Sequence, residues 1–156
     1  MKTSIGIRVT PSIIYFTVVS LKGEDIEFEA IDKIVNPKAL ENPEKLKYIR
    51  NTLSDIIHEF KVTNACIRIS ETSAKSLSID RIYIEGVIQE LFASSTIEQY
   101  FIGQISNISS RLKIKREDFK VYSQGEKDFE GIEEWKQFKL EERESIMSAI
   151  SALGIK

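Results

Sequence analysis

The sequence predicts an α/β fold in which a five-stranded mixed sheet carries helices on both faces. Two observations lead to this prediction. The N-terminal part contains three strand-like segments separated by short turns, which is typical of antiparallel pairing. The remainder alternates amphipathic helical segments with short apolar strands, which is typical of crossover connections and parallel pairing.

The three N-terminal strands are expected at Ser4–Thr10, Ser12–Leu21 and Ile26–Ile31. β-Branched and aromatic residues dominate the first two segments. The third alternates apolar with polar residues, as a half-exposed strand does. Tight turns are expected around Pro11 and around Gly23. These strands should therefore form an antiparallel meander.

A first helix is expected to begin near Asn42, which suits the N-cap position, with Pro43 as the first helical residue. A short apolar strand, Ala65–Ile69, follows this helix. A strand that returns to the sheet after a helix indicates a crossover, so we expect parallel pairing there. The apolar residues of the helix recur at spacings of three and four: Leu46, Ile49, Leu53, Ile56, Ile57 and Phe60.

A second helix is expected to open at Ser78 and Asp80. Gly86 lies inside this helix, at a cost of about 1 kcal/mol relative to alanine. We therefore expect Gly86 to mark a close approach to another backbone. The apolar positions of the helix include Ile79, Ile82, Tyr83, Val87, Leu91 and Phe92.

The C-terminal part is expected to contain a fifth strand at Ile97–Gly103 and a short helix at Ile105–Leu112. From Arg116 to Lys139 the sequence becomes acidic, glycine-punctuated and poorly periodic. We interpret residues 116–139 as an irregular acidic insertion carrying a short helical turn. A final helix should span Leu140–Leu153, with Gly154 as its C-cap. Residues 1–156 should form a single domain.

The composition is that of an ordinary soluble globular protein, with 42% apolar and 29% charged residues. The net charge of −2 gives no overall positive field that would attract nucleic acid. The apolar runs are strand-sized, so no membrane-spanning segment is expected. Cys66 is the only cysteine, which excludes an internal disulfide and a cysteine-built zinc site. We expect a cytoplasmic protein.

The order of elements resembles the RNase H-like fold, in particular RuvC-type Holliday junction resolvases and small bacterial domains related to them. The resemblance covers nearly the whole chain outside residues 116–139. Its local markers are the start at Ile5–Ile7, the strand Cys66–Ile69, Gly86 within its helix and the terminal stretch Glu141–Ile150. The last stretch matches a family helix that begins with two acidic residues three positions apart.

The resemblance implies a site in which three or four carboxylates hold two Mg²⁺ ions for nucleic-acid cleavage. On the first strand, the family has an aspartate where this chain has Arg8. The family glutamate of the fourth strand falls at or near Arg68, with Glu71 just beyond. The acidic pair of the last helix corresponds to Glu141 and Glu144. Two arginines among these carboxylates would form salt bridges with them and end the catalysis.

Each candidate residue also has an ordinary structural interpretation. Arg8 and Arg68 either reach solvent from the strand ends or form a small anion-binding pocket where the metals of the family lie. Glu141 and Glu144 would otherwise be a solvated first turn that complements the helix dipole. Trp135 and Phe138 either pack on the core or contact a partner. Arg8, Arg68, Trp135 and Phe138 are therefore the candidate binding residues.

Two functions follow from these observations. The first is a catalytically inactive RNase H-like domain that serves as a protein-binding or assembly module in a nucleic-acid-associated system. It needs no cofactor, its partner is another protein or a second copy, and any nucleic-acid binding is weak. The alternative is a divergent nuclease that uses Mg²⁺ or Mn²⁺ held by Glu71, Glu141 and Glu144.

Overall fold

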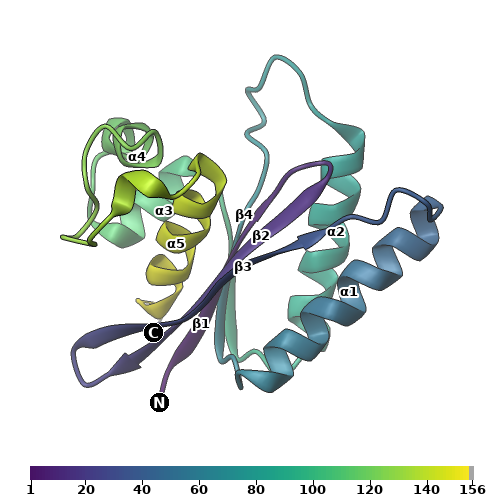
Figure 1. The fold of residues 1–156 in the computed structure, drawn as a ribbon, viewed down its shortest axis with the longest axis horizontal. Coiled ribbons are helices and arrows are strands. Elements are labelled where there is room, and N and C mark those ends of the chain that lie inside the picture. Colours follow the sequence, from purple (N-terminus) through teal and green to yellow (C-terminus); the bar gives the residue numbers. More distant parts are fainter. Residues whose placement is uncertain (155–156) are drawn as a thin grey trace.

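The computed structural model describes residues 1–154, which form one five-stranded sheet with helices on both faces (Figure 1). Among these residues, no helix is long and apolar enough to cross a membrane. The predicted five-stranded mixed sheet is confirmed. The elements in chain order are β1 (Thr3–Val9), β2 (Ile13–Lys22), β3 (Asp25–Val35), α1 (Asn42–Glu59), β4 (Asn64–Arg68), α2 (Ile79–Ser94), β5 (Gln99–Gly103), α3 (Ile105–Leu112), α4 (Arg116–Ser123), a 3₁₀ turn (Trp135–Gln137) and α5 (Leu140–Leu153).

The strand order across the sheet is β3-β2-β1-β4-β5. β1, β2 and β3 form the antiparallel meander expected from their short turns. β3 is longer than predicted and continues to Val35, and a bulge interrupts its pairing with β2 at Val18/Val19. β4 pairs parallel to β1, and β5 pairs parallel to β4, as the crossover connections require.

Helices α1 and α2 cover one face of the sheet, and α3, α4 and α5 cover the other (Figure 1). The first face is held by a core in which Ile5 and Ile7 of β1 meet Leu53 of α1 and Ile88 of α2. α1 begins one residue earlier than predicted, since Glu41 and not Asn42 occupies the N-cap position. α2 opens at Ser78 as predicted, and the Ser78 hydroxyl caps the helix by accepting a hydrogen bond from the Arg81 amide.

Gly86 does not mark a close backbone approach, so that prediction is wrong. It lies on the exposed side of α2, and an added Cβ would meet nothing within 4 Å. The close contact is at Gly6 instead, where an added Cβ would lie 2.1 Å from the Ala149 amide nitrogen of α5. Gly6 and Gly86 both lie among apolar residues in the sequence, but only Gly6 is in contact with the backbone of a covering helix.

Residues 116–139 are more ordered than predicted. They begin with α4, whose Phe119 is buried, and only residues 124–139 are irregular, with the 3₁₀ turn inside them. The Trp135 side chain is fully buried in a second core, between Phe129 and Phe138. The ring of Trp135 therefore packs on the core and is not exposed for a partner, while Phe138 is half-buried beside it.

Candidate functional site

Two arginines lie side by side at the carboxyl ends of the central strands. Arg8 of β1 and Arg68 of β4 are opposite each other in the parallel register. Since residues paired in register direct their side chains to the same face of a sheet, both guanidinium groups emerge on the face that α5 covers. Only 13% of the Arg8 side chain and 8% of the Arg68 side chain are exposed, so neither simply reaches solvent.

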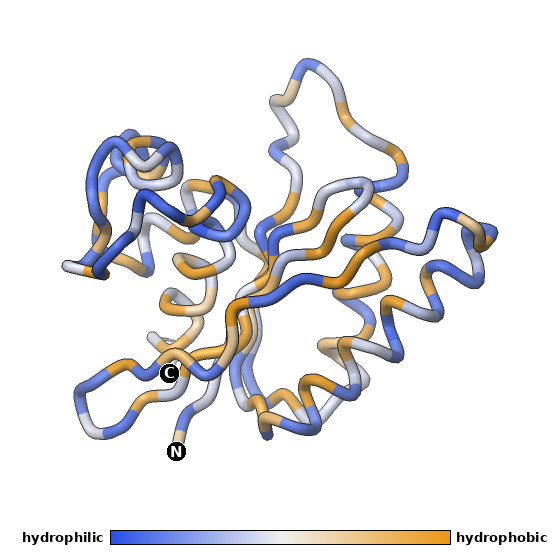
Figure 2. The backbone as a smooth tube through the Cα atoms, viewed as in Figure 1, coloured by the Kyte–Doolittle hydropathy of each residue, from blue (hydrophilic) through white to orange (hydrophobic). Residues whose placement is uncertain are grey.

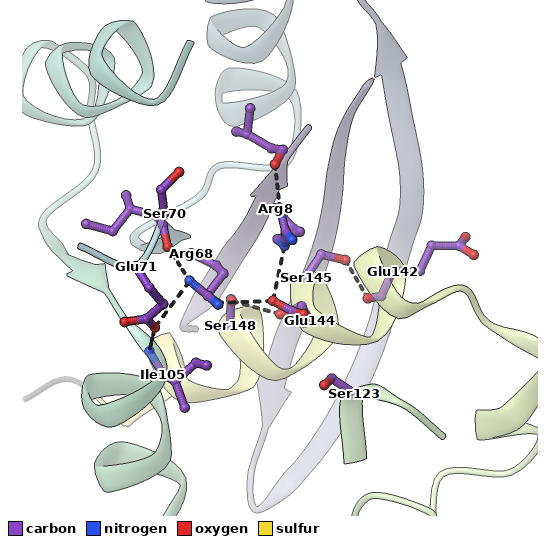
Figure 3. Close-up of polar contacts among 12 residues, drawn as sticks. Arg8, Arg68, Ser70, Glu71, Ile105, Ser123, Glu142, Glu144, Ser145 and Ser148 are labelled. Carbon is purple, nitrogen blue, oxygen red and sulfur yellow. Dashed lines mark hydrogen bonds and ion pairs between the residues drawn. The ribbon is translucent and has the colours of Figure 1, made fainter. Parts of the chain in front are cut away.

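Both arginines bind one carboxylate oxygen of α5. The Nε atoms of Arg8 and Arg68 each donate to Oε1 of Glu144, and each distance is 3.1 Å (Figure 3). The Glu144 side chain is only 6% exposed. A second nitrogen of each guanidinium group is held by a main-chain oxygen, since Arg8 Nη1 donates to Val9 and Arg68 Nη1 donates to Ile69. The result is a buried cluster of two cations around one anion.

Small residues on α5 bring Glu144 down onto the sheet. The Ser4 hydroxyl donates to the Ala149 carbonyl oxygen at 2.5 Å, and the hydroxyls of Thr17 and Ser145 lie 2.8 Å apart. Gly6 leaves the space that the α5 backbone occupies. A helix so close to the strands places the short Glu144 side chain directly between the two arginines.

Glu71 adds a second carboxylate to the cluster. Its Oε1 lies 3.5 Å from Arg68 Nη1 and accepts a hydrogen bond of 2.7 Å from the Ile105 amide (Figure 3). Ile105 is the first residue of α3, so the carboxylate also lies at the positive end of that helix. Glu71 is therefore tied to a guanidinium and to a helix N-terminus.

A further ion pair, between Arg81 and Glu85, lies next to the cluster and was not predicted from the sequence. Arg81 Nε donates to Oε2 of Glu85 at 2.7 Å, and Glu85 also accepts the Ser70 amide at 3.0 Å. Burial lowers the pKa of Arg81, and the nearby positive charge of Arg8 lowers it further. The spacing of Arg81 and Glu85, one helical turn apart, is the sequence signal that could have found the pair.

The structure does not bring Glu141 into this cluster. Within residues 1–154 Glu141 forms no ion pair, and it lies near Tyr15 instead, whose pKa is raised by burial and then by Glu141 and Glu142. No group of three His, Cys, Asp or Glu side chains in the described chain is arranged to hold a metal ion. Of the predicted alternative ligands, only Glu71 and Glu144 meet at Arg68.

The residues at this position do not fit the Mg²⁺ ions that the fold family implies. A magnesium site offers oxygen ligands and net negative charge. Here Oε1 of Glu144 already accepts a hydrogen bond from each of Arg8 and Arg68. A guanidinium group has no lone pair to offer and repels a dication.

Arg143, the neighbour of Glu144, has a different role that sequence reasoning missed. Its buried guanidinium donates to four carbonyl oxygens, with distances of 2.7 Å to Ser123 and 3.1 Å to Trp135 among them. These acceptors all lie in or beside residues 124–139. These hydrogen bonds fix the irregular segment to α5, and within residues 1–154 Arg143 forms no ion pair with a carboxylate.

Comparisons with known proteins identify the fold. No protein-family model matches the chain, and neither does any curated protein sequence. Among solved structures, T. thermophilus RuvC in complex with a Holliday junction matches 97% of this chain and 93% of that chain, with 11% identity and a TM-score of 0.73. The yeast mitochondrial Holliday junction resolvase Ydc2 matches 97% of this chain and 77% of that chain, with 12% identity and a TM-score of 0.57.

The fowlpox virus resolvase in complex with Holliday junction DNA is also similar, over 96% of this chain and 95% of that chain, with 12% identity and a TM-score of 0.56. These identities are low, so the likeness concerns the path of the backbone. The strand order and the helices on both faces agree with it. The chain therefore has the RNase H-like fold, in the form found in RuvC and related Holliday junction resolvases.

Proposed function

We propose that this chain is a catalytically inactive RNase H-like domain that serves as an assembly module. The observation that carries the proposal is the shared hydrogen bonding of Arg8 and Arg68 to Glu144 Oε1. It places two fixed cations at the end of the sheet where the resemblance implies catalytic metals. A dication brought there would be opposed by several kcal/mol in a partly desolvated site.

The exposed side of α2 supports a binding role. Ile79, Ile82 and Tyr83 are 65%, 42% and 51% exposed, and Leu77 precedes them at 46%. Exposed apolar residues that are neighbours on one helix mark an interaction surface more often than isolated ones do. Gly86 lies on the same helix with no atom near its Cβ position, so a partner backbone could come close there.

The occupant we propose for this α2 surface is a second copy of the chain. A single exposed helix face can pair with itself about a two-fold axis, and such self-complementary contacts are the commonest way in which soluble proteins assemble. The small Gly86 allows two helices to cross closely. The resulting dimer would present two sheet ends, each with its own arginine–glutamate cluster.

A nucleic-acid-associated system is the proposed setting. Two of the similar structures are described as complexes with Holliday junctions, of T. thermophilus RuvC and of the fowlpox virus resolvase. An inactive domain of the same fold could take part in an assembly on such DNA without cutting it. The net charge of −2 favours contacts through protein partners over strong binding of DNA by this chain alone.

The catalytic part of the proposal is tested by incubating the purified protein with four-way junction, duplex, single-stranded and hybrid substrates in Mg²⁺ or Mn²⁺. We expect no cleavage above that of a buffer control. Metal-dependent cleavage that disappears in Glu144→Gln or Glu71→Gln would contradict the proposal. It would establish the alternative, a divergent nuclease that uses these carboxylates.

The assembly part is tested by analytical ultracentrifugation of the wild type and of Ile82→Glu. We expect a concentration-dependent dimer that Ile82→Glu abolishes, because a charge would be buried in the contact. Tyr48→Glu, at a 45% exposed position on α1, is the matched control and should leave the dimer intact. A wild type that stays monomeric at high concentration would contradict self-assembly through α2.

A further inference from the structure

β5 forms an open edge of the sheet, since it ends the strand order and pairs only with β4. A groove of about 500 Å³ lies beside it, lined from β5 by Phe101 and Ile102. Phe101 packs on the core of the α5 face and Ile102 on the core of the α1 face, so a groove that both residues line reaches the edge itself. The α3 side of the groove is polar: Ser106, Asn107, Ser110 and Arg111. An open edge strand is a template on which another chain can add a strand.

The backbone groups that point away from β4 can be assigned from a hydrogen bond at the end of β5. The Ile69 amide, just after β4, donates to the Gly103 carbonyl oxygen at 3.0 Å, so Gly103 directs its backbone groups toward β4. In a parallel pair, alternate residues of a strand direct theirs to opposite sides. Tyr100 and Ile102 therefore direct their N–H and C=O groups outward. Within residues 1–154, no turn, loop or side chain is hydrogen-bonded to these outward groups, so they are free to pair with an incoming strand.

A strand added to β5 would meet different chemistry on its two faces, because successive side chains of a strand point to opposite sides of the sheet. A residue opposite Phe101 would face α3, where the guanidinium carbon of Arg111 lies 4.0 Å from the centroid of the Phe101 ring. The residues before and after it would face the α2 side, beside Tyr100 and Ile102. Tyr100 is 43% exposed there, and its ring centroid lies 5.9 Å from that of Phe92. One face of the added strand thus meets a cation and the other meets apolar side chains.

The charges at this edge select an acidic occupant. Between Glu98 and Glu117 the chain contains no acidic residue and four exposed basic ones: Arg111, Lys113, Lys115 and Arg116. Hydrophilic residues also prevail on α4, which follows this basic segment (Figure 2). Within residues 1–154 Arg111 forms no ion pair, and the groove has no acidic residue in its lining. Pairing with the β5 of a second copy would bring two Arg111 side chains together, whereas an acidic side chain would be attracted.

We propose that the outer edge of β5 binds an extended segment of a partner protein in which acidic residues alternate with apolar ones. The segment adds a sixth strand to the sheet through the outward backbone groups of Tyr100 and Ile102. Its acidic side chains lie on the α3 face, where Arg111 binds one of them, and its apolar side chains cover Tyr100 on the opposite face. This inference goes beyond the proposed function, because it assigns a second binding surface that depends neither on cleavage nor on a dimer through α2.

The experiment measures binding of a synthetic peptide in which glutamate alternates with valine, by fluorescence anisotropy with the full chain. A peptide of the same composition with its glutamates and valines in separate blocks is the pattern control, and a peptide that alternates lysine with valine is the charge control. A single-stranded DNA oligonucleotide tests nucleic acid as the occupant. We expect saturable binding of the alternating acidic peptide and weaker binding of every control. Equal or tighter binding of any control would overturn the proposal, as would no binding of the acidic peptide.

The backbone pairing is tested on the peptide, which leaves the fold of the protein untouched. N-methylation of every amide of the alternating acidic peptide keeps its side chains but removes the N–H donors that a sixth strand must supply. Binding should weaken at least about tenfold, the loss that ~1.4 kcal/mol of contact produces. Equal binding of the N-methylated peptide would show attraction by side chains alone and overturn strand addition at β5.

The charge selection is tested with Arg111→Glu, which should weaken binding of the acidic peptide at least about tenfold and allow binding of the lysine–valine peptide. Its matched control is Arg116→Glu, the same change at the exposed first residue of α4, outside the lining of the groove. Arg116→Glu should leave binding of both peptides within about twofold of wild type. Circular dichroism melting curves check that both variants are folded. Equal losses in the two variants would show nonspecific attraction and overturn the proposal, as would unchanged binding by Arg111→Glu.

Discussion

Gly6 of β1 and Ala149 of α5 are in backbone contact, since a Cβ added to Gly6 would lie 2.1 Å from the Ala149 amide nitrogen. Only glycine permits this approach, so any side chain at position 6 must push α5 away from the sheet. We expect Gly6→Ala to lower the free energy of unfolding by at least about 2–3 kcal/mol through overpacking. Chemical denaturation measures the change.

Gly86→Ala is the matched control for this prediction. The exposed helical Gly86 has no neighbour within 4 Å of its Cβ position, so alanine should stabilise α2 by about 0.5–1 kcal/mol. A neutral Gly6→Ala would contradict the placement of α5 on β1, and a destabilising Gly86→Ala would contradict the open position of Gly86 on α2.

Glu144 holds Arg8 and Arg68 together, so removing its charge leaves buried Arg8 without its anion and Arg68 with Glu71 alone. We expect Glu144→Gln to destabilise the fold by about 3–5 kcal/mol. Glu141→Gln makes the same chemical change one turn earlier on α5, where no ion pair exists within residues 1–154, and should stay within about 0.5 kcal/mol of wild type. Thermal melts of the two variants compare them directly, and equal losses would contradict the buried cluster.

Arg143 should control the order of residues 124–139. Arg143→Met keeps an unbranched side chain but removes the guanidinium group. The carbonyl oxygens of Ser123 and Trp135 then lose their donor. We expect faster amide hydrogen exchange and faster proteolytic cleavage in residues 124–139, while the amides of β1 keep their protection. Arg111→Met, at an exposed position of α3, serves as the control. Unchanged exchange in Arg143→Met would contradict the anchoring role.

Alkaline pH should destabilise the protein through Cys66. Burial raises the pKa of the Cys66 thiol from 9.0 to about 12. Between these values the unfolded chain loses the thiol proton while the folded chain keeps it, so stability falls as pH rises from about 9 to 12. Urea denaturation across this range should show the fall, and Cys66→Ala should have a shallower slope. An identical slope in Cys66→Ala would contradict this prediction.

Much of the fold could be predicted because its signals are local. The sequence predicted α1 from its apolar spacing and the start of α2 from Ser78. It also predicted the span of α5 at Leu140–Leu153. α4 was missed because only Phe119 and Ser123 of that helix are buried, which leaves too little apolar periodicity to detect.

The site was predictable only in part. The presence of Arg8, Arg68 and Glu144 suggested salt bridges, and the structure contains them. The roles of Gly86 and Gly6 could not be told apart, because backbone contact depends on which helix covers which strand. The distance of Glu141 from the cluster likewise depends on the rotation of α5, which its small residues set through packing with the sheet.

The claim that the Arg8–Arg68–Glu144 cluster leaves no metal site is tested most directly by equilibrium binding of Mn²⁺ to the unmodified protein. Electron paramagnetic resonance measures the concentration of the free ion. Because Arg8 and Arg68 occupy the site with positive charge, we expect no bound Mn²⁺ at millimolar concentration. The double variant Arg8→Asp, Arg68→Glu should bind it, since carboxylates replace both cations. Stoichiometric binding by the wild type that Glu144→Gln abolishes would contradict the claim that this site is closed to metal.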